Sequence, residues 1–497
     1  MNLEKQLEIA IVEEADKLIK RYQDYHNNLH NEHLRLCKQV IDAPNKKIHT
    51  PDYWKEDKKF NPFYVKRRAK NIAKSICAKI RNKEYSPLPP HKKTIPKSDG
   101  GTRELTIYQI PDSAVSHLFY ERLLNKNRHR FSSYSYAYRN DRNVHFAIQD
   151  ISVDTSQTER MFIAEYDFSD FFGSINHKSL FLQFTQNGFF ISEEEVHVIQ
   201  SFLNDGFKGI PQGTSISLFL ANLVCWKLDN DLERQGLKFA RYADDTVIWS
   251  PDYSSICKAS EIVENFSKRA GVAINQKKSY GINLLVSSGG KAEITSKESF
   301  DFLGYSIGIN SVSIKKKSEQ KIKKKIAYLL YRNLIQPVKS KPLRALIIPS
   351  NDKDAAFLTA ILQIRRYLYG GLSNKQMLEY IQGRSNIIEF KGVMSFYPLV
   401  NNEEQLKGLD GWLLSVIHRA IEKRMKLLRI HNYSVEQSFP FKTTRNNLVS
   451  ECREKKIGGK RLLEIPSFML IYRTLKKGLN DYGIKKVMNP KSLNYDY

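Results

Sequence analysis

A pair of adjacent acids between two apolar stretches constrains this chain more than any other feature. Asp244 and Asp245 follow the largely apolar residues 237–240 and come just before residues 247–249, which are all apolar. This order predicts a strand, a tight turn and a second strand, with both carboxylates at the tip. A hairpin tip suits a divalent metal ion, because the sheet fixes the ligand while water and substrate still reach it. The same residues can also form an ordinary solvated turn, so the choice depends on further segments.

A second acid stands at the end of another apolar stretch. Residues 161–166 are mostly apolar and run into Asp167, and an aromatic turn follows at residues 168–172. An acid at a strand end that faces another at a hairpin tip can form a shared site for two metal ions. Such ions lie about 3.5–4 Å apart and stabilise the attacking and leaving oxygens of an in-line displacement. The alternative is that Asp167 caps the following helix.

A third segment places glycine, proline and glutamine before an apolar helix. Residues 209–213 read Gly-Ile-Pro-Gln-Gly, and the predicted helix after them runs through Asn222, Trp226 and Asp229. Glycine lets the backbone come close to a nucleotide, and a helix start favours phosphate. The loop is therefore a candidate for contact with a nucleotide or a base pair.

The charge of the chain indicates a nucleic-acid partner. The 497 residues include 79 Lys and Arg against 53 Asp and Glu, a net charge of +26 that is spread along the sequence. Phosphate binding by such a surface is favoured by the release of counterions. An anionic membrane surface is the weaker alternative. Because there is no signal peptide and no run of 18 apolar residues, we expect a soluble chain.

The five cysteines are scattered and never form a Cys-x-x-Cys pair. This spacing argues against a structural zinc ion and a disulfide framework, and it fits a reducing cytoplasm.

Residues 91–107 predict a basic hairpin. Two strand-like stretches flank an Asp-Gly-Gly turn, and Arg103 lies near the start of the second stretch. Lysine and arginine on a hairpin can hold a triphosphate, because the guanidinium offers two parallel donors to phosphate oxygens. By itself, the pattern also fits any surface hairpin.

The rest of the chain is predicted to be mainly helical. One helix begins at Pro62 with Asn61 as its cap and carries a basic run to residue 81. Such a run is usually a solvated face, and phosphate contact is the competing interpretation. We expect further helices over residues 1–43, 111–124, 313–335, 361–369, 377–381 and 409–428, strand-like segments over 271–279 and 299–305, and a mixed basic segment from 431 that includes 458–461.

In this order, the segments resemble the reverse transcriptases of the prokaryotic, group II intron-like branch. The resemblance rests on Ile95-Pro96-Lys97, Gly100-Gly101-Thr102-Arg103, Ser135-Tyr136-Ala137-Tyr138-Arg139, Asp167 to Phe172, Pro211-Gln212-Gly213, Tyr242-Ala243-Asp244-Asp245, Lys278-Ser279 and Phe302-Leu303-Gly304-Tyr305. It covers residues 60–310 and extends more weakly to residues 409–412. It implies an α+β, right-hand polymerase with fingers, a palm with an antiparallel sheet and a mostly helical thumb.

The resemblance also implies a division of the chain. It implies an N-terminal helical extension over residues 1–60, fingers and palm over 61–310, a helical thumb over 311–430 and a basic C-terminal extension over 431–497.

Roles for single residues follow from the same resemblance. Asp167, Asp244 and Asp245 are implied to be catalytic and, with the main-chain carbonyl of Phe168, to ligate two Mg²⁺ ions, with Mn²⁺ as an alternative. The dNTP would be held by Lys97, Arg103, Phe172, Gln212 and Lys278. The primer and template would be contacted by Tyr242, Gly213, Phe302, Leu303, Gly304, Tyr305, Lys323 and Lys324. Phe172 matches the gate against a ribose 2′-OH, although Phe171 is adjacent, and Lys278 would lie near the leaving pyrophosphate. Phosphoryl transfer needs this positioning and charge more than covalent chemistry.

Differences from related enzymes narrow the choice of subfamily. No Cys/His cluster or nuclease pattern follows the thumb, and the Val-Thr-Gly motif of retron enzymes is missing. What remains is similar to the "unknown group" reverse transcriptases of bacterial antiphage defence, which often use a dedicated structured non-coding RNA. The resemblance implies a cytoplasmic bacterial ribonucleoprotein that makes cDNA on such an RNA, with a homo-oligomer as an option and without a membrane.

Several alternatives stay open. An RNA-dependent RNA polymerase is disfavoured by the aromatic gate and by Tyr-Ala-Asp-Asp in place of Gly-Asp-Asp. A maturase-like or structural RNA-binding protein with a non-synthesising palm is disfavoured because a scaffold gains nothing from like charges held together. A retron- or intron-type enzyme outside defence is another. A tyrosine hydroxyl can serve as a protein primer, so Tyr495 and Tyr497 are candidates beside the simpler interpretation of an ordinary tail.

Overall fold

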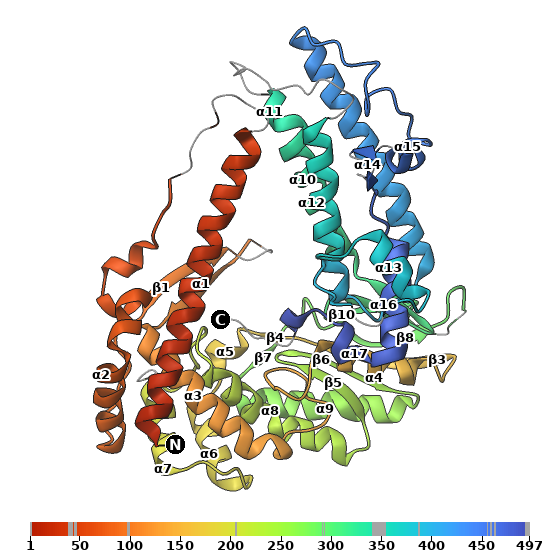
Figure 1. Cartoon of the computed structure of the whole chain (residues 1–497). Coiled ribbons are helices and arrows are strands. Elements are labelled where there is room, and N and C mark those ends of the chain that lie inside the picture. Colours follow the sequence, from red (N-terminus) through yellow and green to blue (C-terminus); the bar gives the residue numbers. More distant parts are fainter. Residues whose placement is uncertain are drawn as a thin grey trace.

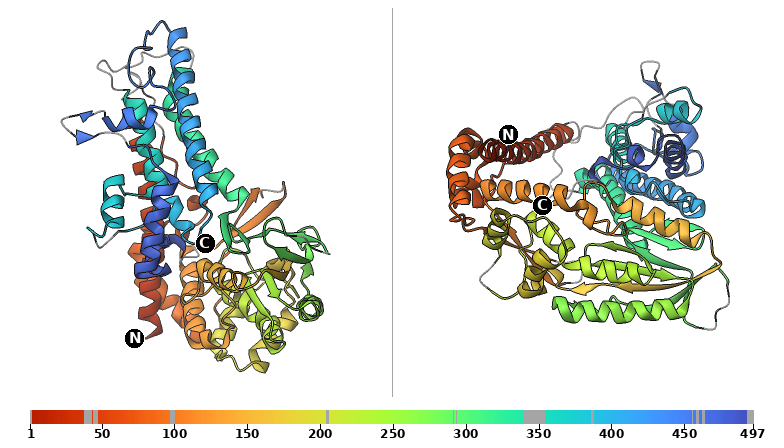
Figure 2. Two further views of the ribbon diagram at one scale, coloured as in Figure 1. Left: turned by 90° about the vertical axis from the view of Figure 1, so that its right-hand side faces the viewer. Right: turned by 90° about the horizontal axis from the view of Figure 1, so that it is seen from below.

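The chain has the expected α+β, right-hand architecture (Figure 1). The computed structural model describes residues 2–492 except 38–42, 44–46, 97–99, 204–205, 291, 293, 340–353, 386–387, 455, 458–459 and 462–463. A sheet with its covering helices forms the base, thumb helices stand at one side of it and N-terminal helices at the other. Figure 2 shows from below that the N-terminal and thumb helices lie on opposite sides of the palm. Lys97, Tyr495 and Tyr497 lie outside the described residues.

The N-terminal region is one long helix, α1 (Leu3–Cys37), packed against α2 (Pro62–Arg81) and α3 (Ile110–Asn127). Leu7 and Ile11 of α1 are fully buried there. Their spacing of four residues places both side chains on the same helix face. The amphipathic helix predicted near the N-terminus is therefore confirmed as a packing element.

Helix α2 begins as predicted. The side chain of Asn61 accepts hydrogen bonds from the N–H groups of Phe63 and Tyr64 at 3.0 and 3.4 Å. These bonds satisfy donors that have no partner within the first turn of a helix. Two short helices precede the cap, η1 (Asp52–Lys55) and η2 (Lys58–Phe60).

The predicted basic hairpin is also present. Strands β1 (His91–Pro96) and β2 (Thr102–Ile107) are antiparallel, and Ile95 pairs with Arg103.

The palm contains a five-stranded sheet with the order β5-β6-β3-β8-β9. Neighbouring strands are antiparallel except β8 and β9, which are parallel. The strands are β3 (Arg160–Tyr166), β5 (Lys238–Tyr242), β6 (Asp245–Ser250), β8 (Gly281–Val286) and β9 (Ser296–Lys297). A separate antiparallel pair joins β4 (Phe168–Ser169) to β7 (Ala273–Ile274), so only two residues of the predicted strand-like segment 271–279 form a strand.

Both faces of this sheet are covered, which explains the continuous apolar run on β6. Val247 and Trp249 pack into the core shared with the thumb, and Ile248 packs into the core on the other face. Successive side chains of a strand point to opposite faces, so a strand buried on both sides reads as uninterrupted apolar sequence. The helices of this part are η3 (Arg128–Arg130), α4 (Val144–Thr155), α5 (Phe171–Ser174), α6 (His177–Gln186), α7 (Glu193–Phe202), α8 (Ile216–Arg234) and α9 (Tyr253–Ala270).

A three-stranded sheet leads into the thumb. It consists of β10 (Ser299–Phe302), β11 (Tyr305–Gly308) and β12 (Ser311–Ile314), and α10 (Lys316–Leu330) follows. The helix predicted over 313–335 is therefore wrong at its start, because residues 313 and 314 pair in β12. It also ends in a π-helix, η4 (Tyr331–Ile335). The other thumb helices are α11 (Gln336–Lys339), α12 (Ala355–Tyr369), α13 (Asn374–Ile381), η5 (Val393–Phe396) and α14 (Glu403–Ile430).

The end of α1 reaches this π-helix (Figure 1). A guanidinium N–H of Arg35 donates to Asn333 Oδ1 at 3.2 Å, and Arg332 pairs with Glu32 at 3.3 Å. The N-terminal helix thus connects the fingers side of the molecule to the thumb.

The C-terminal residues pack back onto the thumb and palm. Helix α16 contacts α13 and α14, and its first N–H groups donate to Asp410 of α14. The elements here are α15 (Leu448–Glu454), β13 (Lys456–Ile457), β14 (Lys460–Arg461), α16 (Phe468–Tyr482), α17 (Ile484–Val487) and η6 (Pro490–Ser492). Across the described residues, we find no helix with the length and apolar character needed to cross a membrane.

Candidate active site

The acidic turn is a two-residue connection between β5 and β6. Tyr242 pairs with Asp245, so Ala243 and Asp244 form the turn. Ala243 has a φ of +61°, a left-handed conformation that costs a residue with a Cβ about 1–2 kcal/mol. The predicted strand, turn and strand are confirmed, with Asp244 in the turn and Asp245 as the first residue of β6.

The register of the sheet brings the third acid to this turn. Tyr166 of β3 is opposite Thr246 of β6, so the next position along β3 places Asp167 beside Asp245. Asp167 is only 7% exposed. The alternative role for Asp167, as a helix cap, is wrong, because Asp170 occupies the position before α5.

Neighbours from the β7–β8 connection hold Asp167 in place. Lys278 Nζ lies 3.1 Å from Asp167 Oδ2, and the side-chain amide of Asn275 donates to the same oxygen at 2.8 Å. The main-chain N–H of Asn275 donates to the Asp167 carbonyl at 2.8 Å, and the N–H of Asp167 donates to Ser279 Oγ at 3.1 Å. Lys278 was predicted at the site. Asn275 was not predicted, because nothing local in the sequence distinguishes it from a surface asparagine.

The acids affect one another's ionisation. Burial, and then the charge of Asp167, raise the pKa of Asp244, while Lys278 and Arg103 oppose this rise. Loss of hydration in the crowded site, and then the charges of Asp244 and Asp167, raise the pKa of Asp245 to about 7. Burial alone would lower the pKa of Lys278, but its contact with Asp167 raises it. Such a cluster of like charges is stabilised by added positive charge.

The chemistry of these donors fits a divalent ion such as Mg²⁺. In the described part of the chain, no three His, Cys, Asp or Glu side chains already lie where they could hold a metal ion between them. Mg²⁺ usually binds through one or two carboxylates together with substrate phosphates and water. The carboxylates therefore suit an ion that is bound jointly with a nucleotide.

A cavity of about 340 Å³ connects Asp167 and Asp245 to the β10–β11 turn. Its lining includes Asp167, Asp245, Lys278, Phe302 and Leu303. The turn that the resemblance assigns to the primer strand therefore adjoins Asp167 and Asp245.

Tyr305 differs from the prediction in one respect. Its side chain is fully buried, and its hydroxyl donates to the Phe396 carbonyl at 3.1 Å and lies 3.1 Å from His145 Nδ1. The ring packs in the core between palm and thumb. Contact with the primer or template strand therefore stays a prediction only for the main chain of Tyr305.

The residues predicted to hold a nucleotide come from separate parts of the chain. Arg103 on β2 is exposed and close enough to Asp244 to affect its pKa. Phe172 in α5 is 8% exposed and lies edge-on to Tyr138, with 6.4 Å between ring centroids. The adjacent Phe171 is buried too and also contacts Phe168.

Gln212 and Gly213 lie against the fingers hairpin. The N–H of Thr106 on β2 donates to the Gln212 carbonyl at 3.1 Å. Gly213 has a φ of +110°, and a Cβ at this position would collide with the Thr106 carbonyl oxygen. The close approach that glycine permits here is therefore to the backbone of β2.

The remaining predicted residues lie at the sheet and on the thumb. Tyr242 is partly buried and packs against both large cores. On α10, Lys323 Nζ is 5.4 Å from the ring centroid of Trp412, and Lys324 is exposed.

A palm sheet that carries three acids, a fingers hairpin and a helical thumb define the right-hand polymerase fold. Within this fold, residues 95–307 match the family described as "Reverse transcriptase (RNA-dependent DNA polymerase)". This part of the chain is therefore similar to a reverse transcriptase domain.

Curated relatives match over parts of their length. The chain is 25% identical over 203 residues to Protein YkfC of Escherichia coli strain K12, which covers 38% of this chain and 52% of that protein. It is 33% identical over 124 residues to the Retron Ec86 reverse transcriptase of Escherichia coli, which covers 24% of this chain and 37% of that protein. The chain thus spans about half of these relatives or less.

Solved structures of telomerases are distantly similar. Telomerase from Candida albicans with the TWJ fragment of telomeric RNA has 13% identity and a TM-score of 0.38, and the match covers 76% of this chain and 69% of that chain. Apo telomerase from Candida tropicalis has 11% identity and a TM-score of 0.38, with 84% and 83% covered.

Proposed function

We propose that this chain is an RNA-directed DNA polymerase that makes cDNA at Asp167, Asp244 and Asp245. The observation that carries the proposal is the β3–β6 register, which sets Asp167 beside Asp245 at the edge of a cavity that reaches the β10–β11 turn. The family match over residues 95–307 and the net charge of +26 support it.

The three aspartates and the Phe168 carbonyl would hold two Mg²⁺ ions, with Mn²⁺ as an alternative. Bound there, the ions would stabilise the charge on the attacking and leaving oxygens of phosphoryl transfer. In the protein itself, Lys278 balances the charge of Asp167. The lysine side chain is exposed, so its ammonium can exchange the Asp167 carboxylate for a pyrophosphate oxygen.

The other residues would position the substrates. Arg103 and Lys97 would hold the triphosphate, Gln212 would lie near the templating pair and Phe172 would exclude a ribose 2′-OH. The primer and template would be contacted by Tyr242, Gly213, Phe302, Leu303, Gly304, the backbone of Tyr305, Lys323 and Lys324. Positioning of this kind accounts for much of the catalysis in phosphoryl transfer.

We assign residues 61–310 to fingers and palm, 311–430 to the thumb, and 1–60 and 431–497 to extensions. We further propose that the template is a dedicated structured RNA and that the enzyme serves antiphage defence in the bacterial cytoplasm. This setting is supported by the absence of the retron Val-Thr-Gly motif from the sequence. Loss of phage protection in a host that carries Asp244→Asn instead of the wild type would test it.

The activity is tested by labelled dNTP incorporation with Mg²⁺ and the RNA that co-purifies with the protein. We expect DNase-sensitive product from the wild type and none from Asp244→Asn. Asp252→Asn is the matched control, because Asp252 only caps α9 and an asparagine also caps. If the wild type makes no product while its RNA stays bound, the chain is an RNA-binding scaffold instead.

A further inference from the structure

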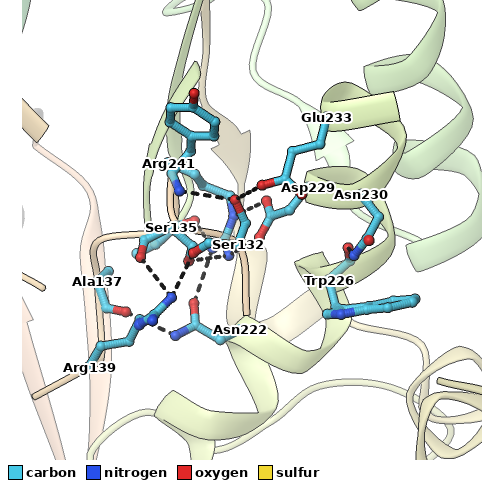
Figure 3. Close-up of polar contacts among 12 residues, drawn as sticks. Ser132, Ser135, Ala137, Arg139, Asn222, Trp226, Asp229, Asn230, Glu233 and Arg241 are labelled. Carbon is cyan, nitrogen blue, oxygen red and sulfur yellow. Dashed lines mark hydrogen bonds and ion pairs between the residues drawn. The ribbon is translucent and has the colours of Figure 1, made fainter. Parts of the chain in front are cut away.

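The guanidinium of Arg241 is buried, and each of its five N–H groups donates a hydrogen bond. Figure 3 shows Arg241 among Ser135, Asn222 and Asp229. Arg241 is 1% exposed. Two N–H groups donate to the two carboxylate oxygens of Asp229, each at 2.7 Å. The others donate to Ser135 Oγ at 2.6 Å, Asn222 Oδ1 at 3.2 Å and the Ala243 carbonyl at 3.2 Å. Arginine has five such donors in a fixed fork, so the fork is completely used.

The acceptors belong to three parts of the palm. Asp229 and Asn222 lie on α8, Ser135 lies in the connection between α3 and α4, and Ala243 is in the catalytic turn. The main chain of Arg241 adds to this link: its N–H donates to the Tyr134 carbonyl at 3.0 Å. Arg241 therefore joins α8, the connection between α3 and α4, and the turn that carries Asp244.

The acceptors are themselves held in place. The side-chain amide of Asn222 donates to the Ala137 carbonyl at 2.9 Å, and Arg139 donates to the Ser132 carbonyl at 2.6 Å. Ser132 Oγ in turn donates to Glu233 of α8 at 2.5 Å. Figure 3 shows these residues as one connected group. Glu233 is exposed, but the other polar residues of the group are buried and hydrogen-bonded, and buried polar networks that are satisfied in this way are rigid.

Ala243 links the network to the active site. It has a φ of +61°, which is unfavourable for alanine, and its carbonyl immediately precedes Asp244. The hydrogen bond from Arg241 fixes this carbonyl. It therefore also fixes the plane of the peptide bond between Ala243 and Asp244.

Stability alone does not explain a buried ion pair of this kind. Replacing a buried pair by apolar side chains of similar volume is often neutral or stabilising, whereas removing one partner leaves an unpaired buried charge. The contacts of Arg241 instead orient the turn relative to α8, because the guanidinium bonds to both at the same time.

We propose that Arg241 is a positioning residue that fixes the 243–244 peptide and thereby sets Asp244 against Asp167. The inference rests on the proposed polymerase function. Arg241 does not touch the reacting atoms, and it acts through the Ala243 carbonyl and the helix carboxylate of Asp229.

The test uses two variants of the full chain with its bound RNA. Arg241→Met with Asp229→Leu removes both charges and keeps an apolar filling, so we expect a folded variant. Its melting temperature should fall moderately, because Asn222 Oδ1 and the Ala243 carbonyl lose their donor. Arg241→Lys keeps the charge but loses the fork. In both, we expect kcat for single-nucleotide incorporation to fall about 100-fold, as for a misplaced catalytic group, while KM for dNTP stays within about twofold. Amide hydrogen exchange at residues 243–246 should rise.

A matched control is the buried pair of Arg424 and Asp354 in the thumb, which are 2.7 Å apart. Arg424→Met with Asp354→Asn should change thermal stability without changing kcat or exchange at the catalytic turn. The proposal is overturned if the folded Arg241→Met/Asp229→Leu variant keeps the kcat and the amide exchange of the wild type. If that variant does not fold, the same result for Arg241→Lys overturns the proposal. Exchange at the turn decides the matter even if the wild type makes no DNA, so the two proposals fail separately.

Discussion

Lys278 Nζ lies 3.1 Å from Asp167 Oδ2, so a cation already partners the acid that ends β3. The side chain of Lys278 is 60% exposed, whereas that of Asp167 is largely buried. Because the ammonium is open to solvent, it can exchange this partner for another anion. The leaving pyrophosphate is such an anion in the proposed reaction.

Replacing Lys278 should therefore slow the chemical step. We expect Lys278→Gln to lower the rate of single-turnover incorporation by about 100-fold, the usual loss when a donor that stabilises developing negative charge is removed. Binding of RNA and the apparent affinity for dNTP should change little. Lys277→Gln is the control, because Lys277 is exposed and adjacent. Equal rates for the two variants in rapid-quench measurements would show that Lys278 only balances charge in the resting protein.

Phe172 provides a prediction about sugar selection. The 2′-OH of a ribonucleotide would meet its ring, and apolar pockets of this kind reject an added hydroxyl by roughly 100-fold. We expect Phe172→Val to lose most of that discrimination while DNA synthesis continues. Competition between rNTP and dNTP on one template measures the ratio. Phe171→Val is the control, since Phe171 is also buried and contacts Phe168. If Phe171→Val relaxes the sugar selection and Phe172→Val does not, then Phe171 and not Phe172 is the residue that excludes the 2′-OH.

Gly213 supports a prediction about stability. Alanine at this position would combine an unfavourable φ of +110° with a collision against the Thr106 carbonyl, so we expect Gly213→Ala to destabilise the protein by about 3 kcal/mol. Gly236→Ala should cost about 1 kcal/mol, because Gly236 shares the positive φ but has open space around it. Chemical denaturation of both variants gives the comparison. Equal losses would mean that the contact with β2 contributes nothing.

The elements that carry the acids could be predicted because their patterns are local. Apolar runs that end in Asp167 and that flank Asp244 contain the strands and the turn within a few residues. The Asn61 cap can be predicted for the same reason, because the N–H groups that donate to its side chain are only two and three residues away. Pairing between β3 and β6, which brings the acids together, follows from the sheet that these runs form.

Contacts between distant segments could not be predicted in this way. Asp229 reads as a polar position on an apolar helix, and only the fold shows that it pairs with Arg241. Tyr305 belongs to a motif with an expected surface role, yet its ring is buried where thumb and palm meet. The contact of Arg35 with Asn333 joins residues almost three hundred positions apart, and no local sequence pattern predicts it.

His145 lies at that same junction of palm and thumb. It is 1% exposed, its Nδ1 lies 3.1 Å from the Tyr305 hydroxyl, and its Nε2 lies 3.3 Å from Ser492 Oγ. Both neighbours are uncharged, so burial is not offset by a carboxylate, and it lowers the pKa of His145 to about 4.

This lowered pKa predicts that acid destabilises the protein through His145. Between about pH 6.5 and pH 4 the unfolded chain binds a proton that the folded chain does not, so stability falls as the pH falls through this window. The loss attributable to His145 should approach about 3 kcal/mol at pH 4. His145→Gln keeps a polar side chain without a titrating group, so the difference in unfolding free energy between variant and wild type should shift in favour of the variant by that amount from pH 7 to pH 4. All other titrating groups are common to the two proteins and cancel in the difference. Parallel curves across this range in urea denaturation would mean that His145 does not titrate differently in the two states.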